Sequence, residues 1–159
     1  MLRADVLGPD GRVLESAAFS EVTIGVRPQP DAVLQSMKKL DGYRVLRRPE
    51  LTRTRLDAEG WVLKEVAGFT LINCVKRTAE AEAGGAAGSE MVQSVLTDGL
   101  THVSVFIEPF HAERHRPVQT AIGATHTLME QRDAWWVTLM GDVPMATLKQ
   151  FAQSLSRNR

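Results

Sequence analysis

The stretch Met91-Val-Gln-Ser-Val-Leu-Thr-Asp-Gly-Leu-Thr-His-Val-Ser-Val-Phe-Ile107 decides the fold. Residues typical of β-strands stand on both sides of Asp98-Gly99, a dipeptide that favours a two-residue hairpin turn because both residues tolerate positive φ. After the turn, Val103, Val105 and Ile107 alternate with the residues between them, which indicates one buried and one partly exposed face. The segment therefore predicts an antiparallel hairpin in a half-buried sheet.

The residues around this hairpin extend the same pattern. Further strands are predicted at residues 61–63, 69–75, 119–129 and 135–140, with a turn near residues 131–133. A helix is predicted to begin at Asp142-Val143-Pro144, and its apolar stripe consists of Leu148, Phe151, Ala152 and Leu155. The second half of the chain is therefore predicted to be α+β and mainly β, a small antiparallel sheet of five or six strands with a C-terminal helix packed on it.

The first 60 residues have a different texture. Residues 3–7 and 12–15 flank Gly8-Pro9-Asp10-Gly11 and predict a hairpin. Residues 26–60 begin with two prolines and carry many charges, so we interpret them as a linker with one short helix starting at Asp31. Residues 78–90 hold no large apolar side chain and predict a mobile loop. The expected units are a terminal hairpin (residues 1–25), a linker (26–60) and a folded domain (61–159).

Composition limits the class of protein. The 159 residues include 19 basic and 19 acidic side chains, and this zero formal net charge argues against a nucleic-acid-binding protein. No stretch approaches the roughly 18 apolar residues of a membrane span. The single Cys74 excludes an internal disulfide and a cysteine-clustered zinc site, and it lies in an apolar strand where a buried, inert thiol is expected.

A search for chemistry finds no catalytic constellation. His111 and His115 are four residues apart, but the segment around them reads as a solvated loop between prolines, so no metal site is predicted. Ser94 and Ser104 lack the setting of a nucleophile elbow. We therefore expect no enzyme activity, no cofactor and no metal, and take a binding function as the default.

Three groups of residues are the candidates for partner binding. Trp135 and Trp136 are adjacent on a strand, so their indoles point to opposite faces. One indole can lie in the core while the other is exposed to a partner, or both rings can be taken up by packing in the core and against the helix. The other candidates are the hairpin turn at Asp98 and Gly99, and the loop arginines Arg114 and Arg116, which could pair with acidic residues or simply be solvated.

Several segments resemble the RseB/MucB family. They are residues 93–100 followed by 103–108, residues 123–125, 136–144 and 147–148, the entry strand 60–63 with Gly68-Phe69, and the opening residues 2–7 through 19–20. The resemblance implies a periplasmic negative regulator of the sigma-E envelope-stress response. Such a protein binds the periplasmic part of a membrane anti-sigma factor, RseA or MucA, and shields it from the site-1 protease.

The same resemblance implies that a larger, LolA-like N-terminal domain is mostly missing from this sequence. The chain then corresponds to the small C-terminal domain with a remnant of the large one, and lipid or lipopolysaccharide sensing would belong to the missing part. The alternative function is a lipid-binding or lipoprotein-binding carrier domain of the cell envelope. The leftover hairpin (residues 1–25) is expected to pack on its own domain, to form a homodimer with a second copy, or to be disordered.

Overall fold

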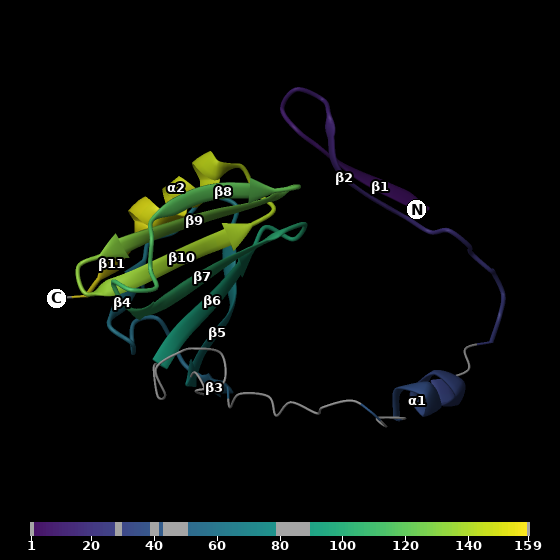
Figure 1. Cartoon of the computed structure of the whole chain (residues 1–159), viewed down its shortest axis with the longest axis horizontal. Helices are drawn as coiled ribbons and strands as arrows, with labels where there is room; N and C mark the ends of the chain where they lie inside the picture. Colours follow the sequence, from purple (N-terminus) through teal and green to yellow (C-terminus); the bar gives the residue numbers. More distant parts are fainter. Residues whose placement is uncertain (1, 28–29, 39–41, 43–50, 79–89, 159) are drawn as a thin grey trace.

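The computed structural model describes residues 2–27, 30–38, 42, 51–78 and 90–158. The chain begins with a two-stranded antiparallel hairpin, β1 (Arg3–Leu7) and β2 (Val13–Ala18), followed by a helix, α1 (Pro30–Lys38) (Figure 1). Both elements were predicted from the sequence. Every residue of β1 and β2 is exposed, as expected for two strands that lie apart from a core. The predicted mobile loop falls almost wholly on residues 79–89, outside the described residues.

The main body is a seven-stranded antiparallel sheet in the order β3-β5-β6-β7-β10-β9-β8 (Figure 1). Its strands are β3 (Leu51–Arg53), β5 (Thr70–Thr78), β6 (Glu90–Thr97), β7 (His102–Pro109), β8 (Val118–Ile122), β9 (Thr125–Arg132) and β10 (Trp135–Gly141). The strand order is not the chain order, because β10 inserts between β7 and β9. This insertion determines the path of the chain between β7 and β8.

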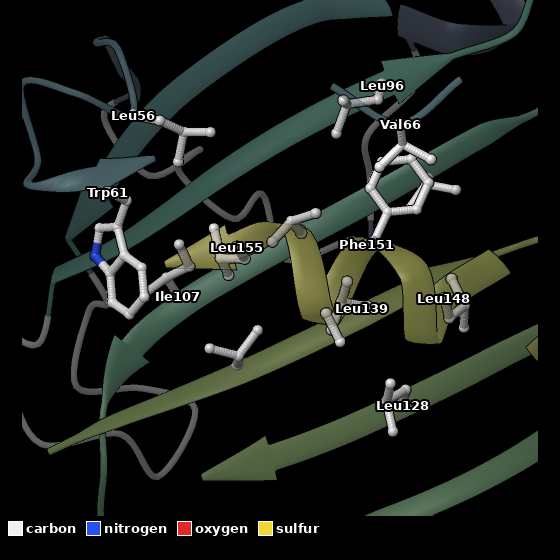
Figure 2. Packing of buried hydrophobic residues seen from close by; sticks show 14 of the residues in the cluster. Leu56, Trp61, Val66, Leu96, Ile107, Leu128, Leu139, Leu148, Phe151 and Leu155 are labelled. Atoms are coloured by element: carbon white, nitrogen blue, oxygen red, sulfur yellow. The ribbon is translucent and has the colours of Figure 1, made fainter. Parts of the chain in front are cut away.

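A second layer covers one face of the sheet. It consists of α2 (Met145–Ser154) and a two-stranded antiparallel pair, β4 (Trp61–Leu63) with β11 (Leu155–Arg157). Figure 2 shows the core between the layers, where the Phe151 ring of α2 lies beside Val66 and points toward Leu96, and where Leu148 and Leu139 belong to the same buried cluster. The Phe151 ring is fully buried and meets Phe69 edge-to-face, with 5.1 Å between ring centroids and an 81° interplanar angle. The apolar stripe of the predicted helix therefore packs where it was expected.

The α+β, mainly β class is confirmed, but the sheet has more strands than predicted. Residues 119–129 were taken as one strand, whereas the structure has a turn at Gly123-Ala124 that separates β8 from β9. Gly123 adopts φ +59°, which a glycine accepts at little cost. Residues 51–53, assigned to the linker, pair with β5 as the edge strand β3. Leu56, from the same assigned linker, is buried in the core.

One glycine is required by the close approach of two strands. Gly141 ends β10 opposite Val103 of β7, and a Cβ atom placed on it would lie 2.3 Å from the His102 carbonyl oxygen. Any side chain there must push β7 and β10 apart at the centre of the sheet.

We predict that Gly141→Ala lowers the free energy of unfolding by about 1–3 kcal/mol, the usual cost of overpacking a close contact. The neighbouring Met140 is 38% exposed, so Met140→Ala is the matched control and should change stability by less than about 0.5 kcal/mol. Urea denaturation followed by circular dichroism measures both variants. Equal midpoints for the two would contradict this account of Gly141.

Candidate partner-binding site

Trp135 and Trp136 point to opposite faces of the sheet, as their adjacency on a strand predicted. Trp135 lies on the helix side, where its ring meets Trp61 at 5.8 Å and 88°. The guanidinium of Arg157 lies over both rings, 4.5 Å from the Trp135 centroid and 5.5 Å from the Trp61 centroid. Trp135 therefore belongs to an aromatic cluster at the end of the second layer, stabilised by cation–π contact.

Trp136 lies on the outer face of the sheet and is only 3% exposed. Its cover is the crossover loop, residues 110–117. The imidazole of His115 stacks on the indole with 4.6 Å between centroids and a 7° interplanar angle, and the Phe110 ring lies 6.0 Å away. An outer-face tryptophan open to a partner was one expectation from the sequence. In this structure it is wrong, because the chain covers Trp136 itself.

The crossover loop takes this path because of the strand order. It leaves β7 and must reach β8, and β10 and β9 lie between these two strands. The loop therefore passes the end of β10, where Trp136 pairs with Glu108 of β7 and with Gln131 of β9. A solvated loop was predicted for this segment, and the structure instead half-buries Phe110, His111 and His115.

His115 is held from two sides. Its Nδ1 accepts a hydrogen bond from the backbone N–H of His111 at 3.0 Å. Its Nε2 lies 3.7 Å from Oε1 of Glu108, and only 10% of the His115 side chain is exposed. Burial lowers the pKa of His115, because an imidazolium ion is poorly solvated there, while the Glu108 carboxylate opposes this effect and Arg114 and His111 add to it. The surroundings of His115 therefore favour the uncharged ring.

The two loop arginines differ in their surroundings. Arg114 and Arg116 are both exposed. The Arg116 guanidinium donates to the carbonyl oxygens of Ala112 and of His115, the latter at 3.0 Å. Arg116 therefore helps to shape the crossover loop, whereas Arg114 sits at its exposed turn. Both lie on the side of the sheet where Trp136 is covered.

Asp98 and Gly99 form the turn of the β6–β7 hairpin, but not the two-residue turn that was predicted. Thr97 pairs with His102, so four residues make the connection. The reason is the Asp98 carboxylate, whose Oδ1 accepts the backbone N–H groups of Leu100 at 2.9 Å and Thr101 at 2.8 Å. Gly99 has φ +95°, while Asp98 keeps a negative φ. These backbone bonds lower the pKa of Asp98.

The candidate residues do not converge on one place. Asp98 and Gly99 lie at one end of β7, and Trp136 with the crossover loop lies at the other end. Trp135 lies near that second end but on the opposite face. Only Trp136, Arg114 and Arg116 are brought together by the fold.

The remaining candidates for chemistry are the Cys74 thiol and any cluster of metal-binding side chains. Burial raises the pKa of the Cys74 thiol, although the Ser94 hydroxyl donates to its sulfur at 3.3 Å and acts in the opposite direction. No cluster of three or more His, Cys, Asp or Glu side chains suited to a metal occurs among the residues that the structure describes. A buried thiol with a raised pKa is a poor nucleophile.

The feature most suited to binding is the edge strand β8, which was not among the residues predicted to bind a partner. All five of its residues are exposed, including Val118 at 41% and Ile122 at 79%, and none is charged. It pairs with β9 in regular register, without a bulge. It was missed because residues 119–129 were taken as one strand; the Gly123 turn was the clue in the sequence.

The N-terminal hairpin touches the end of this edge. Oε1 of Glu15 on β2 accepts the backbone N–H of Ala124 at 3.0 Å. The hairpin tip and the start of α2 also enclose a mainly apolar cleft of about 490 Å³, lined by Leu7, Leu14, Val143 and Met145 among others. Packing on its own domain was one of the three outcomes expected for the hairpin.

The comparisons with known proteins agree with this architecture. A family model described as the MucB/RseB C-terminal domain matches residues 55–156. The chain belongs to this family. No curated protein sequence matches it in a direct comparison.

Two solved structures share the fold of this MucB/RseB family member. One is described as MucB in complex with MucA(peri), with 24% identity and a TM-score of 0.67 over 99% of this chain and 53% of that one. The other is the MucA/MucB complex of Pseudomonas aeruginosa, with 23% identity and a TM-score of 0.68 over 99% of this chain and 50% of that one. The chain thus spans about half the length of these two MucB structures.

We predict a structural role for Asp98 in the family domain. Its pKa is lowered in the fold, so its contribution is complete above the ordinary carboxyl pKa and is lost as pH falls through the lowered value. Asp98→Ala should reduce the hydrogen-exchange protection of the β6–β7 hairpin several-fold at neutral pH, because Leu100 and Thr101 lose their acceptor.

The control is Asp98→Asn, which keeps an oxygen acceptor and should retain most of the protection. Equal protection in the alanine variant and the parent chain would show that the turn forms without the carboxylate.

Proposed function

We propose that this chain is the recognition domain of a periplasmic negative regulator of the sigma-E envelope-stress response. In this proposal it binds the periplasmic part of a MucA-like or RseA-like anti-sigma factor and shields that part from site-1 proteolysis. Family membership supports the regulatory class, and the two similar MucB structures are both described as complexes with MucA. The role is binding, without catalysis.

The observation that carries the proposal is the edge strand β8, whose outer side pairs with no other strand among the residues that the structure describes. The seven-stranded sheet has two edges, β3 and β8. Edge strands are usually protected by charge, shortness or a bulge, since their unpaired N–H and C=O groups attract other strands. The β3 strand has three residues and carries Arg53, whereas β8 has five uncharged residues in regular register.

An unprotected edge of this kind suits strand addition by an extended segment of the partner. The partner backbone would pair with Val118–Ile122, and its alternate side chains would lie on the two faces of the sheet. Arg114, in the loop that leads into β8, would attract acidic residues beside the docked segment.

Localisation in the periplasm is part of this proposal. It is supported by the family resemblance. Within the described residues, no helix has the length and apolar character needed to cross a membrane.

The central test is titration calorimetry of the chain against the periplasmic region of an anti-sigma factor. We expect binding of micromolar strength or tighter, about 8 kcal/mol or more. Thr120→Lys and Thr120→Glu place opposite charges in the middle of β8, and both should weaken binding about ten-fold or more, about 1.4 kcal/mol. A loss of affinity with either charge indicates that the edge itself is disrupted, whereas a loss with only one sign indicates an electrostatic contact with the partner.

The matched control is Thr52→Lys, an exposed residue of the other edge strand, which should leave affinity unchanged. Melting temperatures of all variants should agree with the parent chain. If the Thr120 variants bind normally, β8 is not the docking edge. If the parent chain produces no heat, recognition by this domain alone is refuted.

The loop arginine gives a separate prediction. Arg114→Glu should weaken binding to the anti-sigma segment several-fold, mainly through a slower association rate at low salt, and should not alter the melting temperature. Surface plasmon resonance at two salt concentrations measures this. Arg116→Glu is not an equivalent variant, because its guanidinium bonds to the loop backbone. Unchanged association with Arg114→Glu would remove this residue from the contact.

A second candidate function, an envelope carrier for lipid or another apolar ligand, is supported by the apolar cleft of about 490 Å³ beside the hairpin. This volume lies in the range of small-molecule sites. Native mass spectrometry of the purified chain should then show a bound lipid. Loss of that lipid in Leu14→Asp, with retention in the Val62→Asp control on β4, would place it in the cleft. A spectrum of the free chain alone would count against this candidate.

A further inference from the structure

The crossover loop is held over Trp136 by a backbone hydrogen bond from the Phe110 N–H to the Ala134 carbonyl oxygen at 2.9 Å and, beyond Phe110, by the imidazole of His115. His115 stacks on the indole at 4.6 Å and 7°, and Phe110 lies beside both rings, 5.8 Å from His115 and 6.0 Å from Trp136. Arg116 holds the loop only to its own backbone, at Ala112 and His115. The seating of residues 111–117 on the sheet therefore depends on the chemical state of His115.

The hydrogen bonds define that state. The His111 N–H donates to Nδ1 of His115 at 3.0 Å, so Nδ1 must be the unprotonated nitrogen of the ring. The single proton of the neutral imidazole is then on Nε2, on the side of Glu108, where the nearest carboxylate oxygen is 3.7 Å away. Protonation adds a second hydrogen at Nδ1, which would face the His111 N–H donor to donor.

Three elements surround the ring of His115: β7, the crossover loop and β10. Glu108 on β7 favours the imidazolium ion, but it faces Nε2, which carries a proton in both states. Arg114 and His111 of the loop disfavour the added charge, and Trp136 of β10 buries one face of the ring. Nε2 of His111 is itself buried with no hydrogen-bond partner among the described residues, so opening would allow water to solvate it.

We propose that the crossover loop is an acid-released lid: protonation of His115 at Nδ1 breaks its bond from His111 and lifts residues 111–117 from Trp136 and Glu108, while Phe110 stays bonded to Ala134. The loop continues directly into β8, so lid opening would also loosen the start of the docking edge. That last consequence rests on the proposed function, whereas the lid itself rests on the geometry around Trp136.

The direction of the pH effect follows from the surroundings of the ring. Burial in the closed lid lowers the pKa of His115 below its ordinary value of about 6.5. The open lid therefore binds the proton more tightly than the closed lid does. Closure is fully favoured above about pH 6.5 and weakens as pH falls through the lowered value. Acidification opens the lid, and neutral pH closes it.

The test is amide hydrogen exchange of the full chain by NMR between about pH 8 and pH 5, corrected for intrinsic exchange rates. We expect protection of the His111 amide to fall with the titration of His115, about ten-fold for each unit by which closure lowers the pKa. The Trp136 indole N–H resonance should shift over the same pH range. Protection that does not depend on pH would overturn the proposal.

Two variants provide the controls. His115→Asn places a non-titrating oxygen acceptor near the position of Nδ1, and the pH dependence of the His111 amide should disappear. His102→Gln removes an exposed histidine of β7, and the pH dependence should remain. The same pH midpoint in His115→Asn as in the parent chain would show that another group drives the change.

A further readout does not depend on any variant folding. The ring ¹⁵N shifts of His115 at pH 8 should identify Nε2 as the protonated nitrogen, and a proton on Nδ1 would refute the lid. None of these measurements involves a partner. Failure of the lid therefore appears in the free chain, whereas failure of the proposed function appears as absence of binding while His115 titrates normally.

Discussion

The structure depends on the burial of one face of β7. Val103 and Val105 are fully buried and Ile107 is 1% exposed, and all three lie under the second layer formed by α2 and the β4–β11 pair. Burial of each such side chain contributes about 1.5–3 kcal/mol. Because side chains on a strand alternate, this arrangement sends Ser104, Phe106 and Glu108 to the outer face. A slip of one residue would place Glu108 in the core, so the register of β7 against β6 and β10 is strongly determined.

The position of β10 beside β7 has the largest consequence for the surface. If β8 followed β7 directly in the sheet, a short turn would connect them and Trp136 would have no cover. With β10 and β9 inserted, the connection must travel across strand ends, and it carries Phe110 and His115 to the outer face at Trp136. The same topology leaves β8 as an edge. A covered tryptophan and an open edge strand are thus two results of one strand order.

The electrostatics of this region follow from partial burial. Glu108 and His115 are both largely shielded from water, so their charges influence each other more strongly than an exposed pair would. The exposed ion pairs elsewhere, such as Arg55 with Asp57, lie in solvent and contribute little to stability. Lys76 with Glu59 and Arg132 with Glu130 are partly shielded as well, but among the ion pairs of the described residues the most shielded lies where the crossover loop meets the sheet. In the proposed regulator this is also the approach to the docking edge.

The sequence by itself determined the fold class, the β6–β7 hairpin and α2. These elements rest on local patterns: a period of two in residues 103–107, an apolar helical stripe from Leu148 to Leu155, and Pro144 at the start of α2. Local patterns also placed Trp135 and Trp136 on opposite faces. They did not divide residues 119–129 at Gly123, since the residues on both sides of that glycine have equal β character.

Only the tertiary structure decided which strands are neighbours, and with that the candidate site. Alternation shows which side chains share a face, but it contains no information about which strand lies next to which, because every strand offers the same backbone donors and acceptors. The cover on Trp136, the edge position of β8 and the hydrogen bond from His111 to His115 all depend on contacts set by that order. The turn at Asp98 differs from the predicted two-residue turn because the Asp98 carboxylate, and not a backbone carbonyl of the facing strand, accepts the N–H groups of Leu100 and Thr101.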